Sequence, residues 1–266
     1  MTRASAELAS SGTPQLEASA FPSRGGEIIS YYRALFSRWG PQNWWPAESR
    51  FEVIVGAYLT QNTNWSNVEK AIANLRRARV LTVKGLREIA LRRLETLIRP
   101  SGYFRQKARN LKTFIRFLDR NHRGSLDRMF ACPTRQLREE LLALNGVGPE
   151  TADSILLYAG NHPVLVVDAY TRRILERHGL ITPKTGYEQI RALLEQALIG
   201  ADPAQLLFEP GGTEPRHSVS RMSGMPRGHL SQHFNELHAL IVRVGSRLCR
   251  KTPKCQECPL RDFLTH

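Results

Sequence analysis

The sequence predicts an all-α protein, for three reasons. Apolar residues recur every three or four positions over most of the chain, which is the spacing of one helix face. Glycine or proline stands where most of these patterns stop, as it does at helix ends. Alternating strand patterns are nearly absent, and the apolar run at residues 164–167 is too short to change the prediction.

The first three predicted helices precede a basic region. Apolar spacing predicts a helix at residues 28–39, closed by a glycine. Residues 51–59 are apolar on almost every side, so this second helix should be buried. Ser66 and Glu69 have capping-box spacing at the start of a third helix, which should end near residue 79.

The middle of the chain, residues 76–123, is strongly basic and contains two amphipathic patterns, at residues 86–98 and 107–118. A solvated surface is the default for any single cation here, including Lys107. The whole set is better explained as a side that faces DNA. Further helices are predicted at residues 134–144, 149–159, 169–177, 187–199 and 232–248.

Two segments are predicted to lack stable structure. Residues 1–26 are rich in Ser, Ala, Gly and Pro and have little apolar periodicity, which is typical of a disordered tail. Residues 209–228 form an insert rich in Gly, Pro, Ser and Arg, which predicts a mobile loop.

The net charge indicates the kind of partner. The 266 residues include 38 Lys and Arg against 24 Asp and Glu, a net charge of +14. This excess predicts a polyanionic partner, nucleic acid before membrane, with an unspecialised basic protein as the alternative. The chain has no run of about 18 apolar residues and no signal-peptide core near its start. We therefore expect no membrane partner and a cytoplasmic, nucleoid-associated protein of a bacterium or archaeon.

A Gly-Val-Gly sequence predicts a tight turn between two helices. Thr134 could cap the first helix, and Pro149 suits the first position of the second. Gly146, Val147 and Gly148 should let the backbone approach a ligand closely, with helical N–H groups facing an anion. The pattern therefore indicates a phosphate-binding hairpin, and an ordinary helical hairpin is the alternative.

A single carboxylate follows this hairpin. Asp168 ends the apolar run at residues 164–167 and precedes Arg172 and Arg173. It could cap the helix that follows. Capping explains an aspartate but does not explain the hairpin 20 residues earlier.

The hairpin and the aspartate together resemble the helix-hairpin-helix (HhH-GPD) DNA glycosylase superfamily, in particular its endonuclease III-related members and their 3-methyladenine glycosylases. The resemblance covers about residues 27–262, and its four matching stretches are residues 44–71, 99–108, 141–159 and 166–174.

This resemblance implies a two-lobed fold with the active-site cleft between the lobes. A six-helix domain would occupy residues 42–162, and residues 27–41 and 163–266 would form the second lobe. Asp168 would be the catalytic carboxylate. Gln61 would fill the gap left by an extruded nucleotide, although a helix-end amide is the alternative. The implied partner is double-stranded DNA that contains a damaged base, bound by a monomer, with Arg172 and Lys107 as further DNA contacts.

Two positions depart from the patterns of related enzymes. Bifunctional endonuclease III enzymes have a lysine nucleophile two residues after the second hairpin glycine, where this chain has Glu150. A carboxylate cannot form an imine, so we expect a monofunctional enzyme that leaves an abasic site. Glu150 could belong to the pocket or only favour the helix dipole. The adenine-mismatch branch has a pocket glutamate where this chain has Gly56, which disfavours that activity.

Three of the four cysteines lie close together near the end of the chain. Three such cysteines indicate a metal or cluster site in a reducing compartment rather than a disulfide framework. The resemblance implies a [4Fe–4S] cluster, but the fourth cysteine position is Leu264. We expect a cluster or a relic of one, bound by Cys249, Cys255 and Cys258 and completed, if at all, by His266 or Cys132.

Three tryptophans flank the Gln61 segment, and the sequence contains no obvious general acid. A base that already carries positive charge needs no such acid, and aromatic rings attract it. Trp44, Trp45 and Trp65 could form its pocket, with core packing as the alternative.

These features favour base-excision repair of an alkylated purine. Excision of uracil, thymine or an oxidised pyrimidine is a second hypothesis, and a non-catalytic DNA-binding module is a third.

Overall fold

The computed structural model describes residues 21–206 and 215–264, and throughout these residues it contains helices and loops but no strand. The all-α prediction is thus confirmed. The α-helices are α1 (Phe21–Trp39), α2 (Arg50–Leu59), α3 (Trp65–Arg77), α4 (Val83–Glu88), α5 (Leu91–Leu97), α6 (Phe104–His122), α7 (Leu126–Phe130), α8 (Thr134–Leu142), α9 (Pro149–Ser154), α10 (Ala169–Arg177), α11 (Tyr187–Ile199) and α12 (His229–Arg247). Short helical turns are η1 (Arg99–Ser101), η2 (Ile155–Ala159), η3 (Pro203–Leu206), η4 (Cys255–Glu257) and η5 (Arg261–Phe263).

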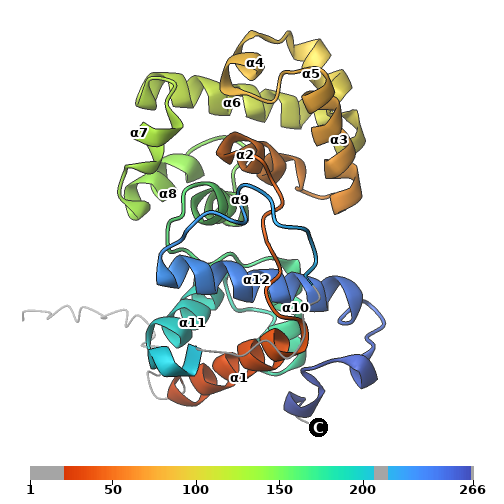
Figure 1. Cartoon of the computed structure of the whole chain (residues 1–266), viewed down its shortest axis with the longest axis vertical. Helices are drawn as coiled ribbons and strands as arrows, with labels where there is room; N and C mark the ends of the chain where they lie inside the picture. The colour runs from red at the N-terminus through yellow and green to blue at the C-terminus, as the bar shows by residue number, and fades with distance from the viewer. Residues whose placement is uncertain (1–20, 207–214, 265–266) are drawn as a thin grey trace, which may run out of the picture.

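The helices form two lobes, one above the other (Figure 1). Helices α2 to α9 make the upper lobe, in which residues 42–162 hold eight helices rather than the six that the resemblance implied. Helices α1, α10, α11 and α12 make the lower lobe, where α1 packs on α11 and α10 packs on α12. The first and last parts of the described chain therefore lie together.

Helix α2 is the centre of the upper lobe because every residue from Phe51 to Leu59 is buried. Ser49 begins the helix by accepting a hydrogen bond from the Glu52 amide at 3.1 Å. Helix α2 packs against η2, which continues α9 as a π-helical turn. The Gly160 amide bonds back to the Ile155 carbonyl at 3.1 Å, five residues earlier, and π-turns of this kind are frequent at functional sites.

Several predicted helix starts were wrong. The first helix begins at Phe21, so residues 21–26 are helical, while residues 1–20 of the predicted tail lie outside the described residues. Asn64 caps α3 in place of the predicted Ser66. Thr134 does not cap α8, because its hydroxyl pairs with His162 Nδ1 at 2.9 Å. The single pattern predicted at residues 86–98 is two helices, α4 and α5.

The predicted mobile insert folds back onto the upper lobe from residue 215 onward, and residues 209–214 lie outside the described part. The Met222 amide donates to the Ala47 carbonyl at 3.0 Å. Asn43 Nδ2 donates to the His217 carbonyl at 2.9 Å. The segment thus covers the loop that contains Trp44. None of the described helices combines the length and apolar character needed to cross a membrane.

Candidate active site

The glycine turn joins α8 to α9, and its two glycines have different roles. Gly146 has φ +81°, and a Cβ there would lie 2.0 Å from Asn110 Nδ2, so the fold itself requires glycine. Gly148 precedes α9 with φ −95°, and a Cβ there would meet no atom within 4 Å. The open space beside Gly148 lets a ligand approach the backbone closely here.

For Val147, backbone contact with a ligand stays a prediction. Its side chain is buried, and its amide donates to the Leu144 carbonyl at 3.1 Å. Its role in the turn is packing.

Asp168 caps α10 and also lies beside Glu150 of α9 and His238 of α12. Its Oδ1 accepts hydrogen bonds from the Thr171 amide at 2.7 Å and from the Thr171 hydroxyl at 2.9 Å. Its Oδ2 lies 3.7 Å from Nε2 of His238 on α12. The carboxylate is only 12% exposed. Capping and a functional role are therefore compatible, because the two oxygens have different surroundings.

Glu150 stands in the first turn of α9, close enough to Asp168 for the two carboxyl groups to interact. Burial, together with the charge of Asp168, raises the pKa of Glu150 to about 7. Protein surrounds the carboxyl group, yet the side chain stays open to solvent on one side, which screens part of this effect. The site thus combines two interacting carboxyl groups in different environments, an arrangement suited to acid–base chemistry.

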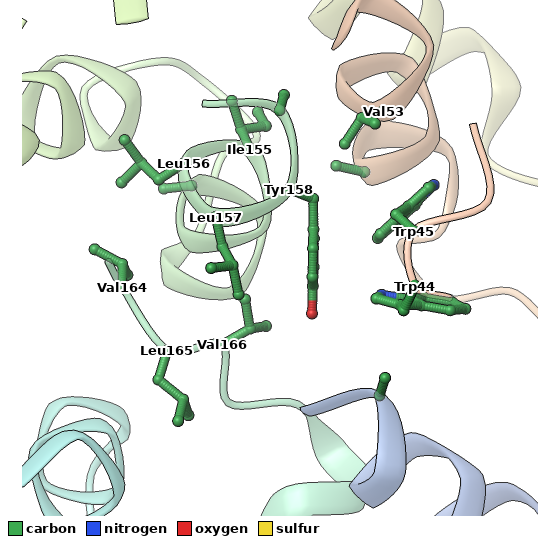
Figure 2. Packing of buried hydrophobic residues seen from close by; sticks show 14 of the residues in the cluster. Trp44, Trp45, Val53, Ile155, Leu156, Leu157, Tyr158, Val164, Leu165 and Val166 are labelled. Atoms are coloured by element: carbon green, nitrogen blue, oxygen red, sulfur yellow. The ribbon is translucent and has the colours of Figure 1, made fainter. Parts of the chain in front are cut away.

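The three tryptophans come together, although they arise from the 44–45 loop and α3. Ring centroids are separated by 5.0 Å for Trp44 and Trp45, by 5.4 Å for Trp44 and Trp65, and by 5.2 Å for Trp45 and Trp65. Tyr158 from η2 extends the cluster, with its ring 5.2 Å from that of Trp45 (Figure 2). Trp44 and Trp45 are buried, so core packing accounts for part of their role.

Gly56 makes this cluster possible. A Cβ at Gly56 would lie 3.0 Å from Trp45 Cζ2, so a glutamate at this position would displace the ring. The same glycine therefore explains both observations: it replaces the glutamate of the adenine-mismatch branch, and it leaves room for the Trp45 ring.

The folded-back insert covers the cluster. The guanidinium carbon of Arg216 lies 5.6 Å from the Trp44 ring, and the His217 ring lies 5.4 Å from it. Burial and the charge of Arg216 lower the pKa of His217 to about 4, so its ring is neutral. Trp44 Nε1, Arg216 Nη1 and His217 Nε2 are buried without a hydrogen-bond partner in the described part of the chain. Buried polar groups without a partner are uncommon, and a bound molecule can satisfy them.

Gln61 and Lys107 make hydrogen bonds that connect neighbouring segments of the upper lobe. Gln61 Nε2 donates to the Gly146 carbonyl at 3.0 Å and to the Thr151 hydroxyl at 2.9 Å. Lys107 was predicted to bind DNA, but it is only 2% exposed, and its ammonium donates to the carbonyls of Leu59 and Ser101 at 2.8 and 2.6 Å. Burial lowers the pKa of Lys107 to about 8. Its prediction as a DNA contact was therefore wrong.

Arg172 also has internal partners. Its Nη1 donates to the Thr185 carbonyl at 2.8 Å and lies 3.6 Å from Glu176. These contacts hold the connection from α10 to α11. The prediction of Arg172 as a DNA contact did not include this internal role.

Tyr103, in contrast, is 69% exposed beside exposed Arg99 and Arg105 at the start of α6. An exposed aromatic ring among cations suits a nucleic-acid surface, and the sequence analysis overlooked it.

The cysteines Cys249, Cys255 and Cys258 line one small cavity together with Leu264 and Arg177. Arg177 Nη1 lies 3.1 Å from the sulfur of Cys249. This set does not fit a four-thiolate cluster, because the fourth position is apolar and a guanidinium contacts one thiol. Within residues 21–206 and 215–264, no three His, Cys, Asp or Glu side chains form a group that could hold a metal ion.

The two proposed completing ligands do not change this result. Cys132 lies in the other lobe, where its sulfur donates to the Arg128 carbonyl at 3.6 Å. His266 lies outside the described residues.

Two further site residues, Tyr158 and His238, were missed in the sequence. Both lie in helical segments whose neighbours are apolar, so each looked like an ordinary core position. The signal that could have revealed both residues is a polar side chain in a helix that is apolar on every side, because a buried polar group needs a partner.

An all-helical fold with a glycine turn, and with a carboxylate between two lobes, defines the class of helix-hairpin-helix DNA glycosylases. Residues 55–198 match the model of the HhH-GPD superfamily base excision DNA repair proteins, and the chain belongs to this family. It is therefore a base-excision-repair DNA glycosylase, which hydrolyses the N-glycosidic bond, and DNA is its partner.

Individual relatives agree with this assignment. The chain is 40% identical over 238 residues to a protein of Methanocaldococcus jannaschii named as a DNA repair glycosylase, covering 89% of this chain and 94% of the other. It is 27% identical over 216 residues to endonuclease III of Thermotoga maritima, covering 80% and 81%. The structure is similar to that of the H. pylori 3-methyladenine DNA glycosylase bound to 1,N6-ethenoadenine, with TM-score 0.68, 27% identity and coverage of 84% and 97%.

Proposed function

We propose that this enzyme is monofunctional and that it releases an alkylated purine. The observation that carries the proposal is the tryptophan cluster, which Tyr158 and His238 connect to Asp168. A purine alkylated at N3 or N7 carries positive charge while it is attached to the sugar, and electron-rich rings attract a cation by roughly 0.5–2 kcal/mol per well-placed ring. The unsatisfied donor of Trp44 supplies a hydrogen bond for an acceptor of the base.

Asp168 and Glu150 have different roles in the proposed reaction. Cleavage of the N-glycosidic bond builds positive charge on the sugar, and the negative charge of Asp168 stabilises it. Glu150 occupies the position of the lysine nucleophile of bifunctional enzymes, where its carboxylate holds and deprotonates the attacking water. Because a carboxylate forms no imine, the product is an intact strand with an abasic site. No step requires an iron–sulfur cluster.

The DNA face combines the glycine turn with two neighbouring loops. Lys107 joins the carbonyls of Leu59 and Ser101, so it holds the loop before Gln61 beside the loop before Tyr103. Gln61 in turn bonds to the glycine turn. We propose that the turn binds a backbone phosphate, that Gln61 enters the gap left by the extruded base, and that the exposed Tyr103 ring stacks on DNA.

The test uses duplexes that each contain one lesion: 7-methylguanine, 1,N6-ethenoadenine, uracil or thymine glycol. Base release is measured by chromatography, and abasic sites are measured by strand cleavage in hot alkali. We expect release of the alkylated purine, cleavage only after alkali, and no adduct trapped by borohydride. The Asp168→Asn variant should bind the same duplexes and release no base. Release of uracil or thymine glycol alone would support the pyrimidine hypothesis, and a trapped adduct would make the enzyme bifunctional.

The pocket is tested separately with Trp65→Ala, because Trp65 is only partly buried and its removal spares the core. Release of the cationic 7-methylguanine should fall by up to about 30-fold, which corresponds to roughly 2 kcal/mol. Equal turnover by this variant, with unchanged preference for the cationic base, would exclude Trp65 from the pocket.

A further inference from the structure

A buried chain of three polar side chains connects the aromatic cluster to the catalytic carboxylate. Tyr158 from η2 makes a hydrogen bond through its hydroxyl group to Nδ1 of His238. The other ring nitrogen, Nε2, lies 3.7 Å from Asp168 Oδ2. His238 is 5% exposed, and Nε2 has no hydrogen-bond partner within the described residues. Three helical elements, η2, α12 and α10, thus bring one side chain each to this place.

The surroundings decide which nitrogen of His238 carries the proton. Burial lowers the pKa of His238, so the ring is neutral and has a single N–H group. Burial raises the pKa of Tyr158 well above its usual value, so the phenol keeps its proton and can either donate to Nδ1 or accept from it. The position of Asp168 beside Nε2 decides between the two, because Nδ1 accepts from Tyr158 when Nε2 carries the proton. The N–H group is then on Nε2 and faces Asp168. The opposite tautomer would direct a lone pair at a carboxylate oxygen, which is repulsive.

We propose that His238 is a positioning residue for Asp168 and that Tyr158 stabilises its tautomer, an inference that rests on the catalytic role proposed for Asp168. Thr171 fixes Oδ1 from one side, and the Nε2–H group of His238 restrains Oδ2 from the other. The separation of 3.7 Å exceeds a hydrogen-bond length. Catalytic hydrogen bonds are often long in a free enzyme and tighten when the substrate binds.

The same chain connects the base pocket to the sugar site. The Tyr158 ring contacts Trp45, with centroids 5.2 Å apart, and its hydroxyl end points away from η2 (Figure 2). The residue that stabilises the tautomer of His238 is therefore part of the proposed pocket wall. A base that enters the pocket contacts the group that orients the carboxylate.

Kinetics of single-turnover base release test the proposal. The His238→Phe variant keeps a planar ring and loses the N–H group, so release should slow by about ten- to a hundred-fold, the effect of one hydrogen bond to a charged group. The dissociation constant for lesion DNA should change little, whereas the unfolding midpoint should fall, because the buried Tyr158 hydroxyl loses its partner. His238→Gln keeps an N–H donor and should recover part of the rate.

Nuclear magnetic resonance of the imidazole nitrogens provides a readout that does not depend on activity. The His238 signals are assigned by their absence from His238→Gln. We expect a neutral ring protonated on Nε2 in the wild type, and a mixture of tautomers in Tyr158→Phe. A proton on Nδ1, a cationic ring, or equal rates for His238→Phe and an active wild type would overturn the proposal. A wild type without activity on every lesion, but with the expected tautomer, would contradict the proposed substrate and not this arrangement.

Discussion

Glu150 is the residue whose titration should be visible in the enzyme's pH dependence. Its pKa is raised to about 7, so it is protonated below that pH and ionised above it. If its carboxylate is the base that activates water, release should rise as pH increases through about 7 and then level off. Glu150→Gln should be slower by roughly 100-fold above this pH and should show no rise. Single-turnover rates from about pH 6 to pH 8 measure both effects. A rise retained in Glu150→Gln would assign it to another group.

The two glycines of the hairpin give a matched pair of variants. Gly148→Val adds a side chain into open space at an allowed φ, so the protein should fold normally. Its affinity for undamaged duplexes of any sequence should fall, because a phosphate can no longer approach the backbone closely. Gly146→Ala should instead lower the free energy of unfolding by roughly 1–3 kcal/mol, since φ is positive there and Asn110 blocks the space. Anisotropy of labelled duplexes and urea unfolding separate the two results. Unchanged binding by Gly148→Val would place the phosphate elsewhere.

At the residue scale, the sequence predicts some site residues better than others. Asp168 could be found because a lone carboxylate after an apolar run, preceded by a glycine turn, is an unusual combination. Lys107 was assigned wrongly because a cation in a basic region looks exposed, and only the fold reveals two carbonyl groups around its ammonium. Tyr158 and His238 are 80 positions apart, so their contact depends on how α12 packs against η2.

The cysteine loop is the element in which one substitution tests a predicted cofactor. Leu264 lines the same cavity as the three cysteines, at the fourth position of the family's cluster pattern. Leu264→Cys supplies the missing thiolate, so this variant, purified anaerobically, should bind more iron and sulfide than the wild type. Leu264→Ser is the control for a change in polarity. Equal contents at the level of a full cluster would show that the wild type has another fourth ligand, and no iron or sulfide in either protein would show that these cysteines hold no cluster.

At the scale of elements, long helices were predicted well and local details were not. The bounds of α10 and α11 agree with the sequence pattern, because their apolar spacing is regular and a cap or glycine marks each end. The pattern at residues 86–98 continues in phase through an extended break at Ile89 and Ala90, so spacing alone could not separate α4 from α5. The π-turn of η2 was also invisible, because every residue of Ile155–Ala159 is buried and apolar spacing does not distinguish a π-helical turn from an α-helix.

Arg138 makes a buried ion pair within the upper lobe and a second, partly exposed pair with the lower lobe. From α8 it contacts the fully buried Asp153 of α9 at 2.6 and 3.1 Å, and Glu188 of α11 at 2.6 Å. Arg138→Ala leaves Asp153 buried without its counter-ion, so the free energy of unfolding should fall by about 3–5 kcal/mol. The control is Arg87→Ala, which breaks a pair with Asp119 at the surface and should cost about 0–1 kcal/mol. Urea unfolding measures both. Similar losses for the two variants would mean that the buried pair contributes no more to stability than a surface pair does.

At the scale of the whole molecule, the class of fold could be predicted from the sequence. The packing of the segment from residue 215 onto the upper lobe could not. Helical spacing and net charge are properties of the sequence, and they predict a helical protein that binds a polyanion. The packing of the segment from residue 215 against the tryptophans depends on contacts between distant positions, such as Met222 with Ala47. The Gly, Pro and Ser content of this segment predicts a loop rather than a helix. It does not indicate which other residues the loop packs against.

The tryptophan cluster gives the protein a built-in optical reporter. Of its four tryptophans, three lie in the cluster, and Trp39 lies apart beneath the guanidinium of Arg243, 4.6 Å from it. Ultraviolet emission of the unlabelled enzyme therefore comes mainly from the pocket. Titration with free 3-methyladenine should quench this emission without any dye, and Trp44→Phe should lose most of the response. If the quenching persists undiminished in Trp44→Phe, the ligand binds away from the cluster. If the quenching is lost in Trp44→Phe, tryptophan fluorescence of the unlabelled enzyme reports the binding of a base in real time.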